Sequence, residues 1–377
     1  MKRIKYALHK MITDPVLCIA WILAIISALI VRPDSEYLSY IDFRSLGILW
    51  GLMVVIQGYR ENSVFEKIGE ILLKKVKTGW QLSLALVFVC FLGSMFITND
   101  VALITFVPFA IMTLSRCNRE DLMIPIVVLQ TVAANLGSML TPVGNPQNLY
   151  LYSLTGMSLF DFIKIMLPYS LATLIFLLVA ILFLPKKKEV LCITSENYNV
   201  VKSFGSLAHI IIYSALFIVS VLTVIRVVPI NIMVVLILLT VSFIDSKIIF
   251  RADYILLLTF VGFFIFTGNI ERIPGIKAFL SEIITGRKFI VSLITSQFIS
   301  NVPATLLLSD FTTDYKELLL GVNIGGLGTL IASMTSLISF KLYTNDYKEK
   351  RFKYIIIFTG INLVFLILLT ALKLFLN

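Results

Sequence analysis

Charged side chains are scarce in this chain of 377 residues. Only 14% of the residues are Asp, Glu, Lys or Arg, whereas a soluble domain carries about 25%. Histidine occurs only at positions 9 and 209, and neither the histidines nor the four cysteines show the spacing of a metal site. No P-loop pattern is present in the sequence. The sequence therefore predicts no enzyme, no cofactor and no ATP-driven step.

Apolar residues fill most of the remainder. They make up 58% of the chain, and runs of helix length recur from Val16 to the C-terminus. Because a membrane helix needs about 20 predominantly apolar residues, we expect an all-α polytopic membrane protein in a lipid bilayer. The net charge of +10 is also seen in nucleic-acid-binding proteins, but basic residues collect on the cytoplasmic side of membrane proteins. We therefore expect no nucleic acid as a partner.

The basic residues also predict the orientation in the membrane. Lys2, Arg3, Lys5 and Lys10 precede the first apolar run, and no small-residue cleavage site follows it. We expect a retained first helix, a cytoplasmic N-terminus and a multi-pass protein of the bacterial inner membrane. With this orientation, most of the 32 Lys and Arg residues fall in cytoplasmic segments.

Four polar breaks interrupt the apolar segments. Residues 98–100 and 300–303 each lie between two apolar arms, and residues 135–146 and 323–329 each interrupt the apolar stretch that follows. The arms around residue 300 are too short to cross a membrane alone. We therefore predict two re-entrant helical hairpins and two discontinuous transmembrane helices. Their non-helical backbone must be buried in protein or line a cavity.

The breaks occur in the same order in the two halves of the chain. The matched pairs are Gly58 with Gly268, Thr98 with Ser300, Asn99 with Asn301, Asn135 with Asn323, Gly137 with Gly325 and Thr141 with Thr329. Paired breaks of this kind are typical of inverted-repeat transporters. In the predicted topology, the first hairpin opens toward the cytoplasm and the second toward the outside.

These patterns divide the chain into four parts. We predict an N-terminal scaffold helix and loop over residues 1–45, a first inverted repeat over 46–184, a cytoplasmic linker with two connecting helices over 185–253, and a second inverted repeat over 254–377. Three lysines at 186–188 mark the linker as cytoplasmic. The segments 59–79 and 269–288 mix charged and apolar residues, which is typical of interfacial amphipathic helices.

Each broken helix leaves backbone groups without helical partners. Free carbonyl groups and side-chain oxygens can replace the water around Na⁺, and free N–H groups attract an anion. Each single residue also has a structural alternative, because the same types form interhelical hydrogen bonds and close packing. The candidate substrate- or ion-binding residues are Thr98, Asn99, Asp100, Asn135, Gly137, Thr141, Gly144, Asn145, Ser300, Asn301, Asn323, Gly325, Gly326 and Thr329. The possible Na⁺ ligands among them are Asn99, Asp100, Asn135, Asn301 and Asn323.

Asp100 is an ionisable residue at the apex of the first hairpin. An ionisable group inside a membrane is costly and marks a functional site by default. Its counterpart in the second half is the apolar Val302. Asp100 is therefore a cation ligand or a proton carrier, or it is an aspartate that caps the second arm of the hairpin.

Three segments resemble the ion transporter superfamily, which includes divalent-anion/sodium symporters, citrate-transporter-like permeases and arsenite permeases. They are residues 96–103, 140–148 and 299–305. The resemblance implies an elevator-like transport domain that carries both hairpins and a scaffold domain that often dimerises, so a homodimer is expected. It also implies Ser-Asn-Thr motifs at both tips for Na⁺ and carboxylate, but Asp100 and Val302 replace the threonines here. The Asn-Asp pair resembles the arsenite-permease and Na⁺/H⁺-antiporter branch.

The expected function is secondary active transport of a small inorganic or organic anion, a carboxylate or an oxyanion, coupled to Na⁺ or H⁺. Two alternatives remain open. One is a Na⁺/H⁺ antiporter of the same superfamily, in which Asp100 exchanges its proton for Na⁺. The other is a non-transporting membrane scaffold or receptor, which leaves the repeated polar breaks unexplained.

Overall fold

The computed structural model describes residues 14–73, 76–185 and 205–376, and within these ranges it contains 17 α-helices and no β-strand. Eight helical segments in the described part are long and apolar enough to cross a membrane. The expectation of an all-α polytopic membrane protein is therefore confirmed. The basic N-terminal residues and the lysines at 186–188, which were used to predict topology, lie outside the described residues.

The first half of the chain contains one hairpin and one broken helix. Its elements are α2 (Pro15–Ile30), η1 (Ser35–Leu38), α3 (Phe43–Glu61), α4 (Val64–Leu73), α5 (Gly79–Ile97), α6 (Asn99–Arg116), η2 (Glu120–Leu122), α7 (Met123–Gly137), η3 (Ser138–Leu140), α8 (Pro146–Thr155) and α9 (Leu159–Leu182). The side chain of Thr78 accepts a hydrogen bond from the N–H of Gln81 and starts α5, and the Gln81 side chain accepts one in return from the Thr78 N–H. This capping box satisfies N–H groups that the helix cannot pair itself.

Two connecting helices and the second half follow. Their elements are α10 (Leu207–Val224), α11 (Ile230–Asp245), η5 (Ser246–Arg251), α12 (Tyr254–Glu271), α13 (Pro274–Ile284), α14 (Lys288–Ile299), α15 (Asn301–Ser309), α16 (Tyr315–Ile324), α17 (Met334–Asp346), η6 (Lys348–Lys350) and α18 (Arg351–Leu376). Helices α5 and α6 pack against each other, as do α14 and α15. The two predicted hairpins and the two predicted helix breaks are thus present.

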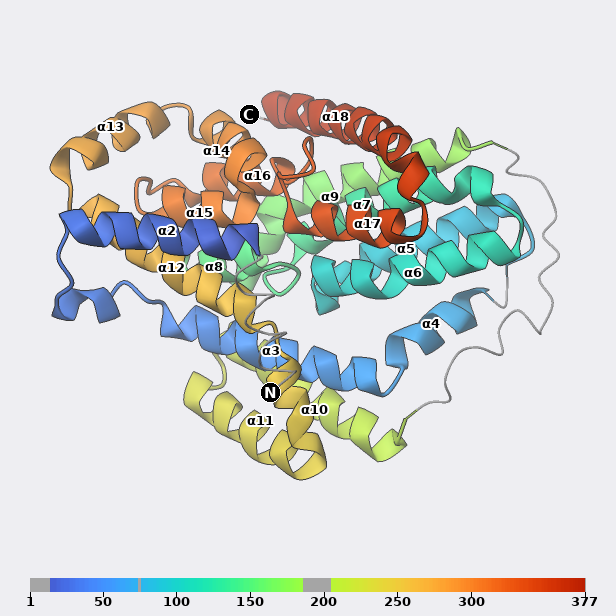
Figure 1. Ribbon diagram of the computed structural model, residues 1–377, viewed down its shortest axis with the longest axis horizontal. Coiled ribbons are helices and arrows are strands. Elements are labelled where there is room, and N and C mark those ends of the chain that lie inside the picture. Colours follow the sequence, from blue (N-terminus) through green and yellow to red (C-terminus); the bar gives the residue numbers. More distant parts are fainter. Residues whose placement is uncertain (1–13, 74–75, 186–204, 377) are drawn as a thin grey trace.

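All the α-helices except α4 and α13 are assigned to two groups that we use below (Figure 1). The central group consists of α5–α9 and α14–α18. The outer group consists of α2, α3, α10, α11 and α12, in which α3 packs against α10 and α11, and α2 packs along α12. Figure 1 shows α3, α10 and α11 as a layer below the central group.

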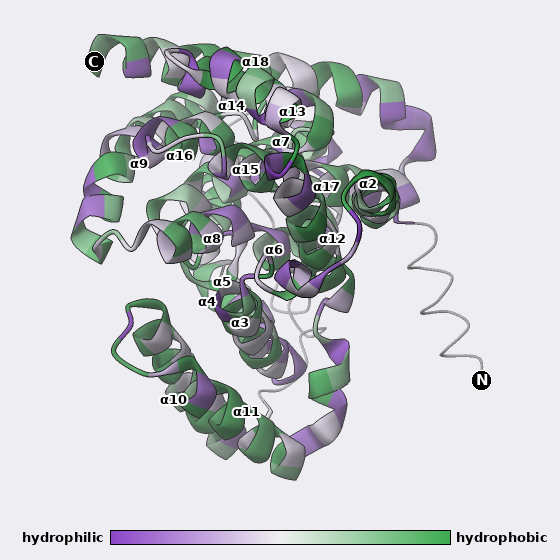
Figure 2. Cartoon of the chain, turned by 90° about the vertical axis from the view of Figure 1, so that its left-hand side faces the viewer, coloured by the Kyte–Doolittle hydropathy of each residue, from purple (hydrophilic) through white to green (hydrophobic). Residues whose placement is uncertain are grey.

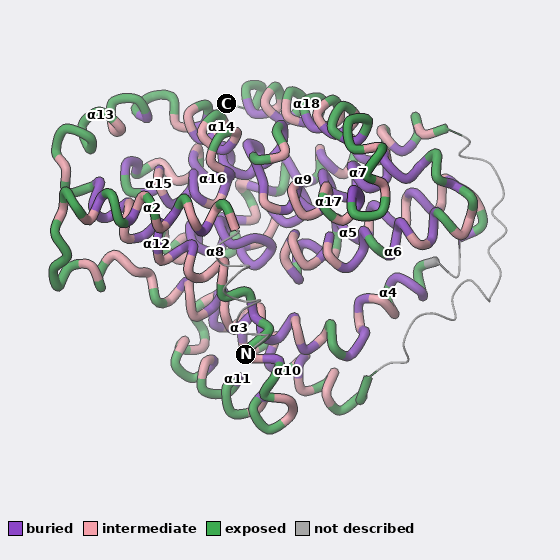
Figure 3. The backbone as a smooth tube through the Cα atoms, in the orientation of Figure 1, coloured by how far each residue is buried: buried purple, intermediate pink, exposed green. Residues whose placement is uncertain are grey.

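Burial separates the middle of the protein from its lipid-facing surface (Figure 3). All residues of α7 except Pro125 are buried, whereas only six residues of α18 are. Large apolar side chains are exposed on α2, α10, α11 and α18, and Figure 2 shows the hydrophobic colour along α10 and α11. Exposed apolar helices of this length match the acyl-chain region of a bilayer. The first polar break therefore lies where the chain shields it from lipid, whereas Thr329 and Ile331 of the second break are exposed.

The two expected amphipathic segments are shorter helices than predicted. Helix α3 continues to Glu61 and α12 to Glu271, so the amphipathic helices are α4 and α13 alone. Helix α4 packs against α6, the second arm of the first hairpin, and a side chain at Gly69 would meet the ring of Phe109 at 2.9 Å, whereas α13 packs against α12 and the first arm α14. Nearly all of α13 is exposed. The two halves thus differ in how this helix supports the hairpin.

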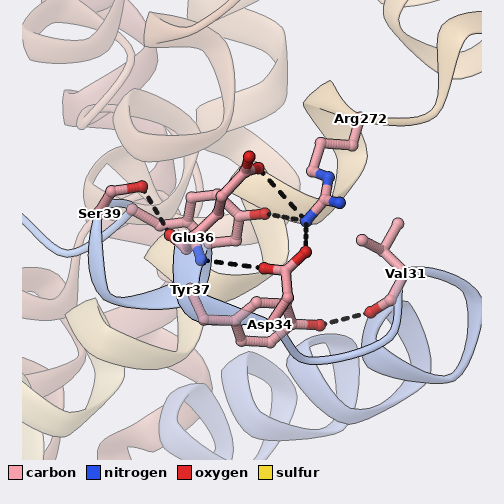
Figure 4. A network of polar contacts seen from close by, with 7 residues as sticks. Val31, Asp34, Glu36, Tyr37, Ser39 and Arg272 are labelled. Carbon is pink, nitrogen blue, oxygen red and sulfur yellow. Dashed lines mark hydrogen bonds and ion pairs between the residues drawn. The ribbon is translucent and has the colours of Figure 1, made fainter.

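A polar network ties the loop between α2 and α3 to the end of α12 (Figure 4). Arg272 donates hydrogen bonds to the carboxylate of Asp34 at 2.8 Å and to the hydroxyl of Tyr40 at 2.9 Å. The hydrogen bond from Arg272 lowers the pKa of Asp34 below its usual value. Because all these residues belong to the outer group or its loop, the network fixes this group internally.

Candidate functional site

The two hairpin tips have the same unusual backbone geometry. Thr98 has φ 67° and ψ 149°, and Ser300 has φ 74° and ψ 154°. A positive φ is costly for a residue with a side chain, by about 1–3 kcal/mol. Matched residues therefore hold matched strained turns, and the surrounding contacts must maintain both.

Each tip is bound to the break of the following helix by an equivalent backbone hydrogen bond. The N–H of Asn99 donates to the carbonyl of Gly144 at 3.0 Å, and the N–H of Asn301 donates to the carbonyl of Ala332 at 2.9 Å. These N–H groups are at the starts of α6 and α15, where no helical acceptor exists. The two acceptor residues, Gly144 and Ala332, are matched by the same alignment that pairs Thr141 with Thr329.

A second pair of equivalent bonds joins each break to the first arm of its hairpin. The hydroxyl of Thr141 donates to the carbonyl of Met95 at 2.5 Å, and the hydroxyl of Thr329 donates to the carbonyl of Gln297 at 3.0 Å. Both threonines were candidate ligand residues. In this structure, their hydroxyl groups hold the breaks against the hairpins.

Asn135, at the end of α7, is bound to the opposite half of the chain. Its Oδ1 accepts a hydrogen bond from the hydroxyl of Ser333 at 2.9 Å, and its Nδ2 donates to the hydroxyl of Ser336 at 3.3 Å. Asn99, from the first tip, donates to the same Oδ1 at 3.4 Å. The amide thus links the first break and the first tip to the start of α17.

Asn323, at the end of α16, makes the reciprocal contacts. Its Oδ1 accepts a hydrogen bond from Nδ2 of Asn145 at 3.2 Å, and its Nδ2 donates to Oδ1 of Asn148 at 2.7 Å. Asn145 and Asn148 start α8, and they occupy the positions that Ser333 and Ser336 occupy in the second half. Each break therefore binds the N-terminal half-turn of the other broken helix. We call these contacts the amide exchange.

The glycines of the breaks are explained by close packing. A Cβ atom at Gly137 would lie 2.2 Å from the carbonyl oxygen of Phe91, and one at Gly325 would lie 2.9 Å from Cα of Leu293. Phe91 and Leu293 are matched residues on the first arms of the hairpins. Two further candidate glycines are also closely packed. A Cβ atom at Gly144 would lie 2.1 Å from the carbonyl oxygen of Ser138, and one at Gly326 would lie 2.9 Å from Nδ2 of Asn301.

The unpaired carbonyl groups of the two breaks are bound by different side chains. In the second half, Nε2 of Gln297 donates to the carbonyl groups of Gly325 at 2.7 Å and Leu327 at 2.8 Å. In the first half, the residue matched to Gln297 is Met95, and the donor is instead Nδ2 of Asn148. It donates to the carbonyl groups of residues 138, 139 and 141 at 3.2–3.4 Å.

Asp100 reaches from the first hairpin to the second half of the chain. Its Oδ1 accepts a hydrogen bond from the hydroxyl of Thr335 in α17 at 2.6 Å, and its own N–H donates to Oδ1 of Asn99 at 3.0 Å. It lies in the first turn of α6, where a carboxylate is favoured by the helix dipole, but it does not cap that helix. The matched Val302 packs against the apolar core. Asp100 therefore breaks the symmetry of the site.

A cavity of about 650 Å³ reaches the first tip. Thr98, Asp100 and Val143 line it from the site, and Arg60, Arg251 and Asp253 are its other charged lining residues. The remaining walls come from α3, α6, η5, the start of α12, and α17. Ser300 and Asn301 of the second tip do not line it. In the predicted topology, this cavity opens toward the cytoplasm.

The site has few charged groups. Within the described ranges, no group of three His, Cys, Asp or Glu side chains is placed to hold a metal ion. The side chains that meet at the crossing of the broken helices are amides and hydroxyls. Such groups serve as hydrogen-bond donors and acceptors and as ligands of hard cations.

Ser336 was missed in the sequence. It lies at the position matched to Asn148, so the repeat itself was the signal that identifies it.

Thr329 is exposed, and it is the one candidate whose side chain lies toward the surface of the break. The other candidates are buried or half-buried in the two tips, the two breaks and the amide exchange.

Matching hairpins, crossed broken helices and a cavity that reaches one tip define a membrane transporter of the inverted-repeat class. The family model described as citrate transporter matches residues 7–314. The chain therefore belongs to the citrate transporter family, and the resemblance to the ion transporter superfamily is confirmed.

The relatives of this chain are also transporters or membrane proteins. It is 33% identical to an uncharacterized transporter of Methanocaldococcus jannaschii over 326 residues, which cover 86% of this chain and 87% of that protein. It is 28% identical to the inner membrane protein YbiR of Escherichia coli, with 81% of each chain covered. The silicon efflux transporter LSI3 of Oryza sativa is 32% identical over 144 residues, which are 38% of this chain and 29% of that protein.

Proposed function

We propose that this transporter moves a small inorganic or organic anion, a carboxylate or an oxyanion, and that Na⁺ or H⁺ drives it. The amide exchange carries the proposal, because it fixes the N-terminal ends of α8 and α17, whose first residues Pro146 and Met334 both line the cavity. Half-helix N-termini attract anionic groups. An elevator-like movement, a homodimer, and a location in the bacterial inner membrane with a cytoplasmic N-terminus belong to the same proposal.

The site also offers oxygens for a coupling Na⁺. An amide oxygen has two lone pairs, and Oδ1 of Asn323 accepts one hydrogen bond, from Asn145. Asn99, Asp100, Asn135 and Asn301 add further oxygens at the two tips and the first break. We propose that Na⁺ binds among these groups when the anion is present.

Asn99 and Asn301 test the site. We expect Asn99→Ala and Asn301→Ala each to lower the initial rate of anion uptake into proteoliposomes by at least about tenfold, which corresponds to roughly 1.4 kcal/mol of lost stabilisation. Citrate, arsenite, sulfate and phosphate form the substrate panel. Because both side chains are short and buried, the unfolding temperature is measured in parallel.

The matched control is Asn231→Ala, an exposed asparagine in the first turn of α11, which should transport like the unmodified protein. Normal uptake by both tip variants contradicts the site assignment. Failure of the unmodified protein to move any member of the panel contradicts the anion proposal and leaves the second candidate below.

The second candidate is exchange of Na⁺ for H⁺ at Asp100. The hydrogen bond from Thr335 and the absence of a matched carboxylate at Val302 favour it, because they single out Asp100 as the ionisable residue of the two hairpin tips, and Asp100 lines the cavity. We expect Asp100→Asn to abolish a Na⁺ flux that is driven by a pH gradient and needs no anion. Asp310→Asn, at the end of α15 and away from this cavity, is the control that keeps the flux. A flux that survives in Asp100→Asn rejects this candidate.

A further inference from the structure

Two arginine side chains from the outer group hold the C-terminal end of α8. Arg226, in the turn between α10 and α11, donates to the carbonyl oxygens of Gly156 at 2.9 Å and Tyr152 at 3.0 Å. Arg44, in the first turn of α3, donates to the hydroxyl of Ser153 at 3.0 Å. The last carbonyl groups of a helix lack helical partners and carry partial negative charge. Two guanidinium groups therefore stabilise this end of α8.

The contacts are specific in geometry. Arg44 also donates to the carbonyl of Thr223 at 3.1 Å, so its guanidinium bridges α8 and the end of α10. Arg226 lies 5.7 Å from the ring centroid of Tyr152, and its backbone has φ 67°. This conformation is unfavourable for a residue with a side chain, so the contacts with α8 help to maintain it. We call Arg44 and Arg226 with their acceptors the α8 clamp.

The α8 clamp and the cavity lie at opposite ends of α3. Arg44 is in the first turn of this helix, whereas Arg60, which lines the cavity, is in its last turn. The clamp thus joins the central and outer groups on one side of the membrane, while the cavity separates them on the other. Helix α8 connects the two regions, because its N-terminal end takes part in the amide exchange.

The second half has no equivalent clamp at the matched position. The alignment that pairs Gly58 with Gly268 places Tyr254 opposite Arg44. Tyr254 lines the cavity, and its hydroxyl donates to the carbonyl of Ile249 in η5, which follows α11, at 2.8 Å rather than to α17. The central and outer groups are therefore joined on the side of Arg44 and separated by the cavity on the side of Tyr254.

We propose that the α8 clamp is a latch that stabilises the state with the cavity open and that must release before the site can face the other side. Contacts made in only one of two states shift the equilibrium toward that state by their differential stabilisation. Charge-assisted hydrogen bonds are the strongest of their kind, so loss of either arginine favours the opposite state. The latch concerns alternation between states and does not depend on the identity of the substrate.

Labelling of a cysteine in the cavity tests the latch. The four native cysteines are replaced, and Ile104→Cys provides a reporter in α6 that lines the cavity. A membrane-impermeant maleimide is applied to vesicles from the side of Arg60. We expect Arg226→Ala and Arg44→Gln to lower the ratio of cavity-open to cavity-closed molecules by about tenfold, which appears as slower labelling of the reporter.

Arg272→Ala is the matched control. It also removes an arginine with two oxygen acceptors, but Asp34 and Tyr40 are in the outer group or its loop (Figure 4). Its labelling rate should equal that of the reporter protein. Unchanged labelling in folded Arg226→Ala and Arg44→Gln overturns the latch. If Arg226→Ala does not fold, Arg226→Lys is used instead, because lysine keeps the positive charge but has fewer N–H donors. An unchanged labelling rate of the reporter in Arg226→Lys also overturns the latch.

Discussion

Asn323→Leu should lower the free energy of unfolding by about 2 kcal/mol and abolish transport. The Asn323 side chain accepts a hydrogen bond from Asn145 and donates to Asn148 and to the carbonyl of Leu319. Leucine has a similar size but leaves Oδ1 of Asn148 buried without that donor. Denaturant unfolding in detergent gives the stability, and uptake into proteoliposomes gives the activity. Asn135→Leu should behave alike, because it breaks the reciprocal half of the amide exchange.

Asn362→Leu is the control for these variants. Asn362 is fully buried in α18, and its Nδ2 donates only within its own helix, to the carbonyl of Phe358, while its Oδ1 has no partner. Its replacement should leave stability and transport nearly unchanged. If Asn323→Leu is as stable and active as Asn362→Leu, the amide exchange does not hold the broken helices together.

We expect Gly137→Ala to destabilise the protein by about 1–3 kcal/mol and to reduce transport strongly. The added methyl group would lie 2.2 Å from the carbonyl oxygen of Phe91. Because that oxygen belongs to the backbone of α5, it cannot rotate away, and the first hairpin must shift relative to the break. Thermal unfolding and uptake measure the two effects.

Gly360→Ala is the control, and we expect it not to destabilise the protein. A Cβ atom at Gly360 meets nothing within 4 Å, and alanine is favoured over glycine in a helix by about 1 kcal/mol. This variant should be as stable as the original chain or slightly more stable. Equal stability of Gly137→Ala and Gly360→Ala contradicts the close approach of α5 and α7.

The sequence was most informative where polarity interrupts an apolar run. The turns at Thr98 and Ser300 and the breaks after Asn135 and Asn323 were predictable, because polar and glycine residues are costly in a lipid-facing helix and stand out in an apolar chain. The repeat was predictable because the same residue types recur in the same order in the two halves, and the structure gives these matched residues the same geometry. Asn99 and Asn135 are hydrogen-bonded to each other in the structure, and the role of the matched residues as ligands stays a prediction.

Contacts between distant residues could not be predicted from local patterns. The α8 clamp joins Arg226 and Arg44 to a helix end far away in the sequence, and arginines near membrane helix ends are common. The hydrogen bonds from Gln297 to the second break could not be predicted from the repeat either, because the matched residue in the first half is Met95. The cavity depends on how the outer and central groups are arranged, which no single segment encodes.

The amide exchange has a consequence for the origin of this fold. Every contact that Asn135 makes with the second half has a counterpart that Asn323 makes with the first. An ancestral chain of half the length would therefore have found the same partners on a second copy of itself inserted upside down. Such a chain needs nearly balanced basic residues at its two ends in order to insert both ways. In a single chain that holds both halves, each half can change independently of the other, and Asp100 opposite Val302 is such a difference.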